Sequence, residues 1–308
     1  MSGPGGLRGR LVDAGYAAGW RLVRALPAPF ARRMFTFGAD LATRRGGASV
    51  TRLRANLARV RPDATPAELD ALVRAGMRSY ARYWCETFRL PAMDLDALRA
   101  DVGPRIRGLE HVEASIAAGR GTIVALPHSG NWDVAGVWLS GRCGRFTTVA
   151  ERLRPESLYR RFVAYRESLG FEILPLTGGT EPTGEVLARR LAANGVVCLV
   201  ADRDLGAGGV TVDFFGEPAK FPVGPARLAE RTGAALLPVG LWFTEDGWGF
   251  TVHPPVVADS TKAAVQAVAD AFARDIAAHP EDWHMLQPFW LADRPARRRA
   301  PRAAQERA

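Results

Sequence analysis

His128 and Asp133 lie five positions apart in residues 123–138, IVALPHSGNWDVAGVW, where an apolar segment turns through small and polar residues into a helical pattern. An imidazole in such a loop is suited to act as a general base, because its ordinary pKa lies near neutrality. Asn131 is a residue type favoured at helix N-caps, and it predicts a helix whose free N–H groups could bind an oxyanion or a phosphate beyond the strand.

Two interpretations of Asp133 follow from this spacing. On one continuous helix, five positions correspond to about 500° of rotation, so the two side chains would not share a face. With His128 in the loop and Asp133 in the first helical turn, the carboxylate can fold back and orient the imidazole. In the alternative, His128 is a loop histidine bonded to the backbone and Asp133 only stabilises the helix N-terminus.

A second carboxylate follows another apolar segment, residues 196–210, VVCLVADRDLGAGGV. Its acidic, basic and acidic triplet begins at Asp202, at the end of a predicted buried strand, where charges rarely occur without a partner. Asp202 could hold His128, and Arg203 could bind a phosphate. Alternatively, the triplet is a salt-bridge cluster at the surface.

Several common site patterns are absent from the sequence. No GxSxG segment supports a serine nucleophile. The histidines form no HxxxH or HExxH pattern and the three cysteines share no CxxC spacing, so we expect no metal site and no disulfide framework. The lack of GxGxxG after a first strand argues against a dinucleotide-dependent oxidoreductase.

From about residue 105 onward, apolar segments alternate with helical ones. Strands are predicted at residues 121–127, 146–152, 171–176, 195–204, 209–216, 235–243 and 249–256. Helices are predicted at residues 109–119, 131–140, 155–169, 181–194, 223–233 and 262–279. This alternation indicates an α/β fold with a mostly parallel central sheet covered by helices on both faces. Ligands bind beyond the carboxyl ends of such strands, where His128 and Asp202 both lie.

Residues 1–50 are predicted to form an N-terminal helical hairpin, with helices at 10–26 and 29–45. The second helix carries an apolar stripe at helical spacing, made by Phe30, Met34, Phe37 and Leu41. The hairpin either packs on the main body or lies in a membrane interface with its arginines on anionic lipid.

The remaining chain divides into a large domain and a tail. Residues 51–293 are expected to form the α/β domain, and within them Thr65 and Glu68 predict a capping box at the start of a long helix. Residues 294–308 are rich in Pro, Ala and Arg and have no apolar period, so we expect a basic disordered tail.

The chain is strongly basic, with a formal charge of +9 that comes almost entirely from arginine. Such a surface suits nucleic acid, anionic lipid or a phosphate-rich cosubstrate, and charge alone does not choose among them. Arg166, on a predicted helix, could reach a phosphate or a headgroup, or could lie at the surface. We find no signal peptide and no apolar run of the ~18 residues that would span a bilayer, which predicts a soluble or peripheral cytoplasmic protein.

The motif HSGNWD, a histidine followed by four residues and an aspartate, is similar to the HxxxxD motif of glycerolipid acyltransferases. The ordered set PHSGNWDVAG, YRESLGFEILPL, ADRDL, GVTVDFFGEPAKFPVGPARLAERTGAALLPV and DWHMLQPFW resembles more closely the lipid A lauroyl/myristoyl acyltransferase family. It covers roughly residues 105–290 and is far more specific than the short motif.

The resemblance implies an acyl-CoA-dependent O-acyltransferase at the cytoplasmic face of the cell membrane, bound peripherally to the inner-membrane surface. The acceptor would be a mannose hydroxyl of a phosphatidylinositol mannoside or a similar anionic glycolipid, and the acyl group is expected to be palmitoyl. Acyl-CoA would be a cosubstrate, with no further cofactor, no metal and no nucleic acid.

The resemblance also assigns roles to residues. His128 would deprotonate the acceptor hydroxyl, with no covalent acyl-enzyme, and Asp202 or Asp133 would orient it. The substrate-binding candidates are Arg166, Arg203, Asn131 and Glu230.

Two alternatives remain open from the sequence. The acceptor could be another glycolipid or a glycerolipid. The chain could instead be a non-enzymatic basic protein that binds membrane, in which case replacing His128 would be silent and binding would fall steeply with salt.

Overall fold

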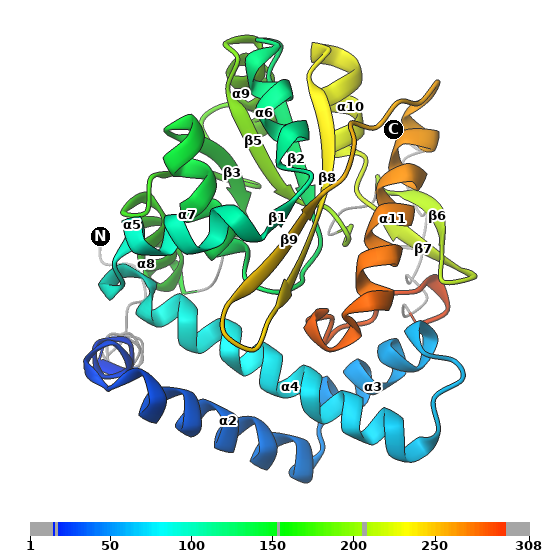
Figure 1. Ribbon diagram of the computed structural model, residues 1–308. Helices are drawn as coiled ribbons and strands as arrows, with labels where there is room; N and C mark the ends of the chain where they lie inside the picture. The colour runs from blue at the N-terminus through cyan, green and yellow to red at the C-terminus, as the bar shows by residue number, and fades with distance from the viewer. Residues whose placement is uncertain (1–14, 16–17, 153–154, 205–207, 294–308) are drawn as a thin grey trace, which may run out of the picture.

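Residues 15, 18–152, 155–204 and 208–293 are the part of the chain that the computed structural model describes. They contain a seven-stranded sheet in the order β1-β9-β8-β2-β5-β3-β4 (Figure 1). Its strands are β1 (Ile106–Arg107), β2 (Thr122–Leu126), β3 (Phe146–Ala150), β4 (Phe171–Pro175), β5 (Val196–Val200), β8 (Ala235–Phe243) and β9 (Trp248–Val252). Every pairing is parallel except that of β8 with β9, which a short turn joins. The predicted mostly parallel sheet is therefore confirmed.

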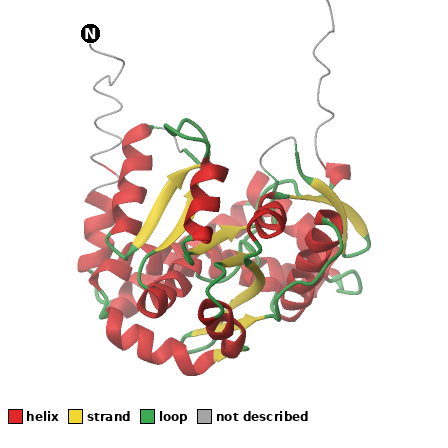
Figure 2. Ribbon diagram, turned by 90° about the horizontal axis from the view of Figure 1, so that it is seen from above, coloured by secondary structure: helices red, strands yellow, loops and turns green. Residues whose placement is uncertain are grey.

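Helices cover both faces of this sheet, as Figure 2 shows from above. In β2, Ile123 and Ala125 point into one apolar cluster, while Val124 and Leu126 point into another. The first cluster packs against α9 (Thr183–Ala192), α10 (Gly224–Thr232) and α11 (Thr261–Ala278). The second packs against α5 (Leu95–Val102), α6 (Leu109–Ala117), α7 (Trp132–Cys143) and α8 (Glu156–Glu167). The all-apolar strands predicted from the sequence are apolar because both faces are buried.

One predicted strand does not belong to the main sheet. β6 (Val210–Phe214) pairs antiparallel with β7 (Glu217–Phe221), for which no strand is predicted, and the two form a separate hairpin. Its turn uses two left-handed residues, Phe215 at φ 54° and Gly216 at φ 77°. Only alternate residues of β6 are buried, such as Val212 and Phe214, which is typical of a strand covered on one face.

The helices before the sheet in the described chain include a segment at residues 18–25, then α2 (Ala28–Arg45), α3 (Ala48–Val60) and α4 (Pro66–Arg89), and α5 follows them. The predicted capping box is confirmed at the start of α4, where Thr65 and Glu68 bond reciprocally. α2 runs along α4 and buries its small residues Ala31 and Ala39. Short 3-10 turns complete the described chain: η1 (Leu90–Ala92), η2 (Gly103–Arg105), η3 (Pro280–Asp282) and η4 (Leu291–Asp293).

The predicted apolar stripe of α2 faces away from the body. Phe30, Met34 and Phe37 are 56, 41 and 67% exposed. The helix thus packs through one face, as the first alternative for the hairpin expects, and leaves the other uncovered. Residues 18–25 of the predicted helix at 10–26 are helical, whereas residues 10–14 and 16–17 and the whole tail at 294–308 lie outside the described residues. In the described part, no helix has the length and apolar character that crossing a membrane requires.

Candidate active site

His128 and Asp202 meet at the carboxyl edge of the sheet. β2 and β5 are adjacent and parallel, and their register pairs Leu126 with Val200. Two residues beyond that pair, His128 Nδ1 lies 2.5 Å from Asp202 Oδ1, and the His128 backbone N–H donates to Asp202 Oδ2 at 2.9 Å. The carboxylate therefore holds both the ring and the backbone of the histidine.

The environment of Asp202 keeps its carboxylate ionised. The residue is 0% exposed, and the Trp283 indole N–H donates to its Oδ2 at 3.1 Å. Burial alone would raise the pKa of the Asp202 carboxyl, but His128 and the hydrogen bonds from its backbone and from Trp283 lower that pKa below its ordinary value. An ionised carboxylate here can stabilise an imidazolium and fix the imidazole tautomer.

Residues 282–285 hold the histidine loop from behind. The Gly130 N–H donates to the Asp282 carbonyl at 3.0 Å, and the His284 N–H donates to the His128 carbonyl at 2.8 Å. Trp283, between them, reaches Asp202 as described above. No local pattern in the sequence predicts this role, because it depends on a contact between residues far apart in the chain.

His128 opens onto a cavity of about 1110 Å³. Its side chain is 34% exposed, and because Nδ1 faces Asp202, Nε2 is the ring nitrogen that remains for a ligand. The Trp132 ring stands edge-on to the imidazole, with 5.9 Å between ring centroids. The cavity is lined further by Tyr80, Tyr83 and Trp84 of α4. It therefore combines a candidate base with several aromatic side chains.

Asp133 contacts Arg166 rather than His128. Arg166 Nε donates to Asp133 Oδ1 at 2.9 Å, and the hydroxyls of Thr87 and Tyr83 approach Oδ2 at 3.4 and 3.5 Å. Burial alone would lower the pKa of the Arg166 guanidinium, but Asp133 raises it above its ordinary value. Of the two carboxylates considered from the sequence, only Asp202 is in contact with the imidazole.

Asn131 positions the start of α7. Its side chain accepts from the Val134 N–H at 3.1 Å, which confirms the predicted N-cap, and its amide donates to Glu86 Oε2 at 2.8 Å. Glu86, on α4, also accepts from Trp248 Nε1 at 2.7 Å and from Arg82 Nε at 2.8 Å. Asn131 is 1% exposed and does not line the cavity, so its contacts are structural.

The other two substrate-binding candidates, Arg203 and Glu230, lie in different places relative to the cavity. Arg203 lines the cavity, together with Arg166, and these guanidinium groups are suited to phosphate. Glu230 lies outside it: its exposed carboxylate accepts from the Thr261 hydroxyl at 2.5 Å. Nothing in the local sequence shows which face of α10 would turn away from the site. Among the described residues, no cluster of His, Cys, Asp and Glu could hold a metal ion.

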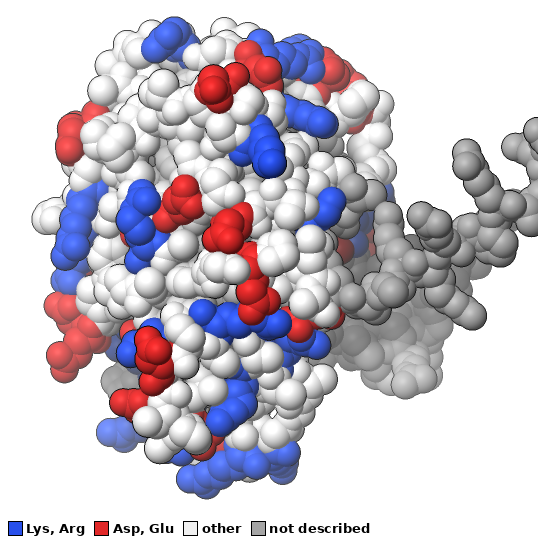
Figure 3. Space-filling model, turned by 90° about the vertical axis from the view of Figure 1, so that its right-hand side faces the viewer, with Lys and Arg blue, Asp and Glu red and all other residues white. Residues whose placement is uncertain are grey.

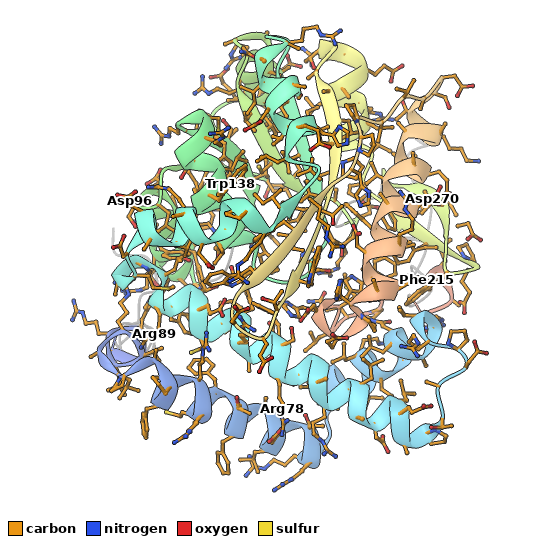
Figure 4. The ribbon with its side chains drawn as sticks, viewed as in Figure 1. Arg78, Arg89, Asp96, Trp138, Phe215 and Asp270 are labelled. Carbon is orange, nitrogen blue, oxygen red and sulfur yellow. The ribbon has the colours of Figure 1, made fainter. Side chains whose placement is uncertain are left out.

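A smaller apolar cavity of about 110 Å³ adjoins the first. It lies between the sheet and α7, and Trp138 of α7, which Figure 4 labels, forms part of its lining. The two cavities share a wall made by Trp132, Val149, Arg166, Leu199 and Val200. An elongated apolar group could therefore extend from the His128 cavity into the interior.

A buried polar network lies behind the histidine loop. The Ser79 hydroxyl donates to Asp282 Oδ1 at 2.5 Å, and His284 Nε2 lies 2.8 Å from the same hydroxyl. Burial raises the pKa of Asp282 to about 6 and lowers the pKa of His284 to about 3. His284 is therefore neutral at pH 7, and it donates from Nε2 because the Ser79 proton is directed at Asp282.

Comparison with known proteins places the chain in a family. The model of the bacterial lipid A biosynthesis acyltransferases matches residues 10–292. A phosphatidylinositol mannoside acyltransferase of Mycolicibacterium smegmatis is 56% identical over 303 residues, which cover 97% of this chain and 98% of the relative. Proteins of that name from two strains of Mycobacterium tuberculosis are 57% identical over 291 residues, 94% of this chain and 92% of each relative. With its sheet, its His128 cavity and this match along nearly its whole length, the chain belongs to the bacterial lipid A biosynthesis acyltransferase family.

Proposed function

We propose that this protein is a membrane-associated O-acyltransferase that moves a fatty acyl group, with palmitoyl as the expected one, from acyl-CoA to a mannose hydroxyl of a phosphatidylinositol mannoside. The acceptor class is that named for the relatives. The observation that carries the chemistry is the His128–Asp202 pair, whose imidazole has its second nitrogen available at the cavity.

In the proposed reaction, His128 Nε2 takes the proton of the acceptor hydroxyl as the oxygen attacks the thioester carbonyl. Asp202 stabilises the imidazolium that forms. The tetrahedral intermediate then collapses, the carbon–sulfur bond breaks, and the proton passes from Nε2 to the departing CoA thiolate. One ester bond forms as one thioester bond breaks, and no acyl-enzyme intervenes.

The two cavities suit the two ends of an acyl-CoA. The apolar cavity beside α7 would take the fatty chain, because its lining offers almost only hydrophobic side chains. Arg166, on the wall that both cavities share, would contact the thioester or the acceptor, and Arg203 would contact phosphate groups of the CoA or the lipid.

Membrane association would occur through α2, at the cytoplasmic face of the cell membrane. Support comes from three exposed apolar side chains on one face, Phe30, Met34 and Phe37, and from the arginines that flank them. An amphipathic helix of this kind lies in the interface with its apolar face among lipid chains.

Release of CoA tests the proposal. The purified protein is incubated with palmitoyl-CoA and a phosphatidylinositol mannoside in detergent, beside His128→Ala and the control His111→Ala, which alters a histidine of α6 outside the cavity. We expect acceptor-dependent CoA release that His128→Ala abolishes and His111→Ala preserves. Equal release by the wild type and His128→Ala would overturn the catalytic role.

The same assay decides between acceptors. Glucosamine-based lipids and glycerolipids are offered in place of the mannoside. A preference for either would keep the acyltransferase and replace the acceptor, and no release with any of them would favour a basic membrane-binding protein.

A further inference from the structure

A further cavity, lined by charged side chains, lies apart from the active site. It measures about 390 Å³ and is formed by α2, α3 and α4. Its charged lining consists of Asp40, Arg44, Arg54, Asp70, Arg74 and Arg78. In Figure 4, Arg78 lies beside α2 at the lower edge of the molecule, and Figure 3 shows basic side chains gathered at that end.

Two of its four arginines are already neutralised. Arg78 forms a two-pronged pair with Asp40, with Nε–Oδ1 and Nη2–Oδ2 distances of 2.7 Å each. Arg54 pairs with Asp70. With four guanidinium groups and two carboxylates, the lining keeps a charge of +2.

The surplus charge belongs to Arg44 and Arg74. In the described chain neither forms an ion pair with a carboxylate, although both lie close enough to Asp40 to help lower its pKa, after the larger effect of Arg78. Both are exposed, so the two guanidinium groups remain available on the same hollow. Guanidinium groups bind phosphate through two parallel hydrogen bonds, which fits an anionic ligand with two or more oxygens.

The exposed apolar stripe of α2 leads to this cavity. Arg44 comes seven positions after Phe37 and three after Leu41, so it continues the same face of the helix toward its C-terminal end. A ligand with a phosphate in the cavity would therefore have the stripe directly beside its remaining part. A soluble phosphate compound would leave the stripe unused, whereas a phospholipid would use both.

We propose that the cavity between α2, α3 and α4 binds the phosphate of an anionic membrane phospholipid, while Phe30, Met34 and Phe37 contact its acyl region. The site rests on the membrane location proposed above and not on the acyl transfer. It fixes the orientation of the bound protein, because α4 presents Arg74 and Arg78 to this cavity and Tyr80 and Tyr83 to the active-site cavity.

The test compares two matched double variants of the full-length protein. Arg44→Gln/Arg74→Gln removes the surplus charge of the cavity. Arg120→Gln/Arg145→Gln removes the same charge from exposed arginines that precede β2 and β3, at the amino-terminal edge of the sheet. Binding is measured by sedimentation with phosphatidylcholine vesicles that contain phosphatidylinositol, and with pure phosphatidylcholine vesicles.

We expect the cavity variant to bind the anionic vesicles at least about tenfold more weakly than the control variant, since general attraction to the surface depends on total charge and is equal in both. Equal losses in the two variants would overturn the site in favour of unspecific electrostatics. Inorganic phosphate added at constant ionic strength distinguishes a site for free phosphate from a site for a lipid. If phosphate binds the cavity saturably but the wild type does not prefer the anionic vesicles, the lipid proposal is also overturned.

Activity on detergent-dispersed substrate separates this proposal from the enzymatic one. The cavity variant should keep the CoA release of the wild type there, because its substitutions lie outside the active-site cavity. If the wild type releases no CoA but binds anionic vesicles selectively, the proposed function fails and the lipid site stands.

Discussion

Asp202 and Asp133 are both completely buried near the carboxyl edge of the sheet, yet they contact different kinds of basic side chain. Asp202 contacts an imidazole, a ring that can take up and release a proton during a reaction. Asp133 contacts a guanidinium, which stays charged throughout. The first pair suits a site where charge changes during a reaction, and the second suits a site where charge must be constant.

Because of this difference, different experiments should report on the two carboxylates. Removing the charge of Asp202 should appear mainly in the rate, because the imidazolium loses its stabilising partner. Removing the charge of Asp133 should appear mainly in stability, because Arg166 is left as an unpaired charge in the interior.

The largest expected effect is on turnover. Asp202→Asn should lower kcat by about 10²–10⁴-fold, because an amide neither stabilises the imidazolium nor selects the tautomer as a carboxylate does. Saturating CoA-release assays give the value. Asp275→Asn is the matched control, since Asp275 pairs with His253 at 2.7 Å outside the active-site cavity. Similar losses in both variants would remove the distinction that we draw for Asp202.

The next effect is on folding. Asp133→Asn should lower the free energy of unfolding by about 3–5 kcal/mol, the usual result of leaving a buried charge unpaired. Urea unfolding measures it, and Asp133→Asn/Arg166→Met should recover most of the loss. The exposed pair of Glu181 and Arg189 provides the control, because Glu181→Gln should cost about 1 kcal/mol or less. If Asp133→Asn alone leaves the free energy of unfolding unchanged, the pair of Asp133 and Arg166 does not stabilise the fold.

A third buried group, His284, extends the comparison to pH. Its pKa is about 3 in the folded protein and 6.5 ordinarily, so between these values the unfolded chain binds a proton that the folded chain does not. The contribution of His284 to the free energy of unfolding is therefore lost as the pH falls below 6.5. From pH 7 to pH 5, His284 should contribute a loss of about 2 kcal/mol.

Unfolding in urea at the two pH values checks this contribution. His284→Asn should lose about 2 kcal/mol less than the wild type over that interval, since its side chain does not titrate. His111→Asn, at a more exposed histidine, should follow the wild type. An identical acid loss in His284→Asn and the wild type would contradict the buried neutral state.

The smallest effect concerns the indole that supports Asp202. Trp283→Phe keeps an aromatic ring but removes the N–H, and should lower kcat about tenfold, as expected for a lost hydrogen bond to a charged group. Trp290→Phe is the control, because Trp290 is equally buried and donates at 3.0 Å to a backbone carbonyl. A comparable kcat in the two variants would assign Trp283 a packing role only.

Much of the fold could be predicted because its signals are local. Apolar segments, Asn131 as an N-cap and the reciprocal bonds of Thr65 and Glu68 all depend on residues a few positions apart. The β6–β7 hairpin was harder, since Pro218 and Lys220 interrupt the apolar pattern of its second strand.

The site could be predicted only in part, because its contacts cross the fold. His128 and Asp202 were identifiable as strand-end residues, but their contact required the pairing and register of β2 with β5. Glu86 and Trp283 lie on segments with no catalytic pattern, and their roles depend on packing against that edge. The position of Glu230 also depends on packing: its helix was predicted from the sequence, but not the face of that helix on which the carboxylate lies, outside the cavity.

The separation of 74 positions between His128 and Asp202 also links the site to folding kinetics. A contact between distant parts of the chain forms late, because closing the intervening loop costs entropy before parallel strands can pair. The dyad cannot exist until β2 and β5 have joined, so a chain that has only its local helices has no assembled base. Recovery of CoA release after dilution from urea would then report the closing of the central sheet, and fragments of the chain that end before residue 196 would carry His128 without its partner.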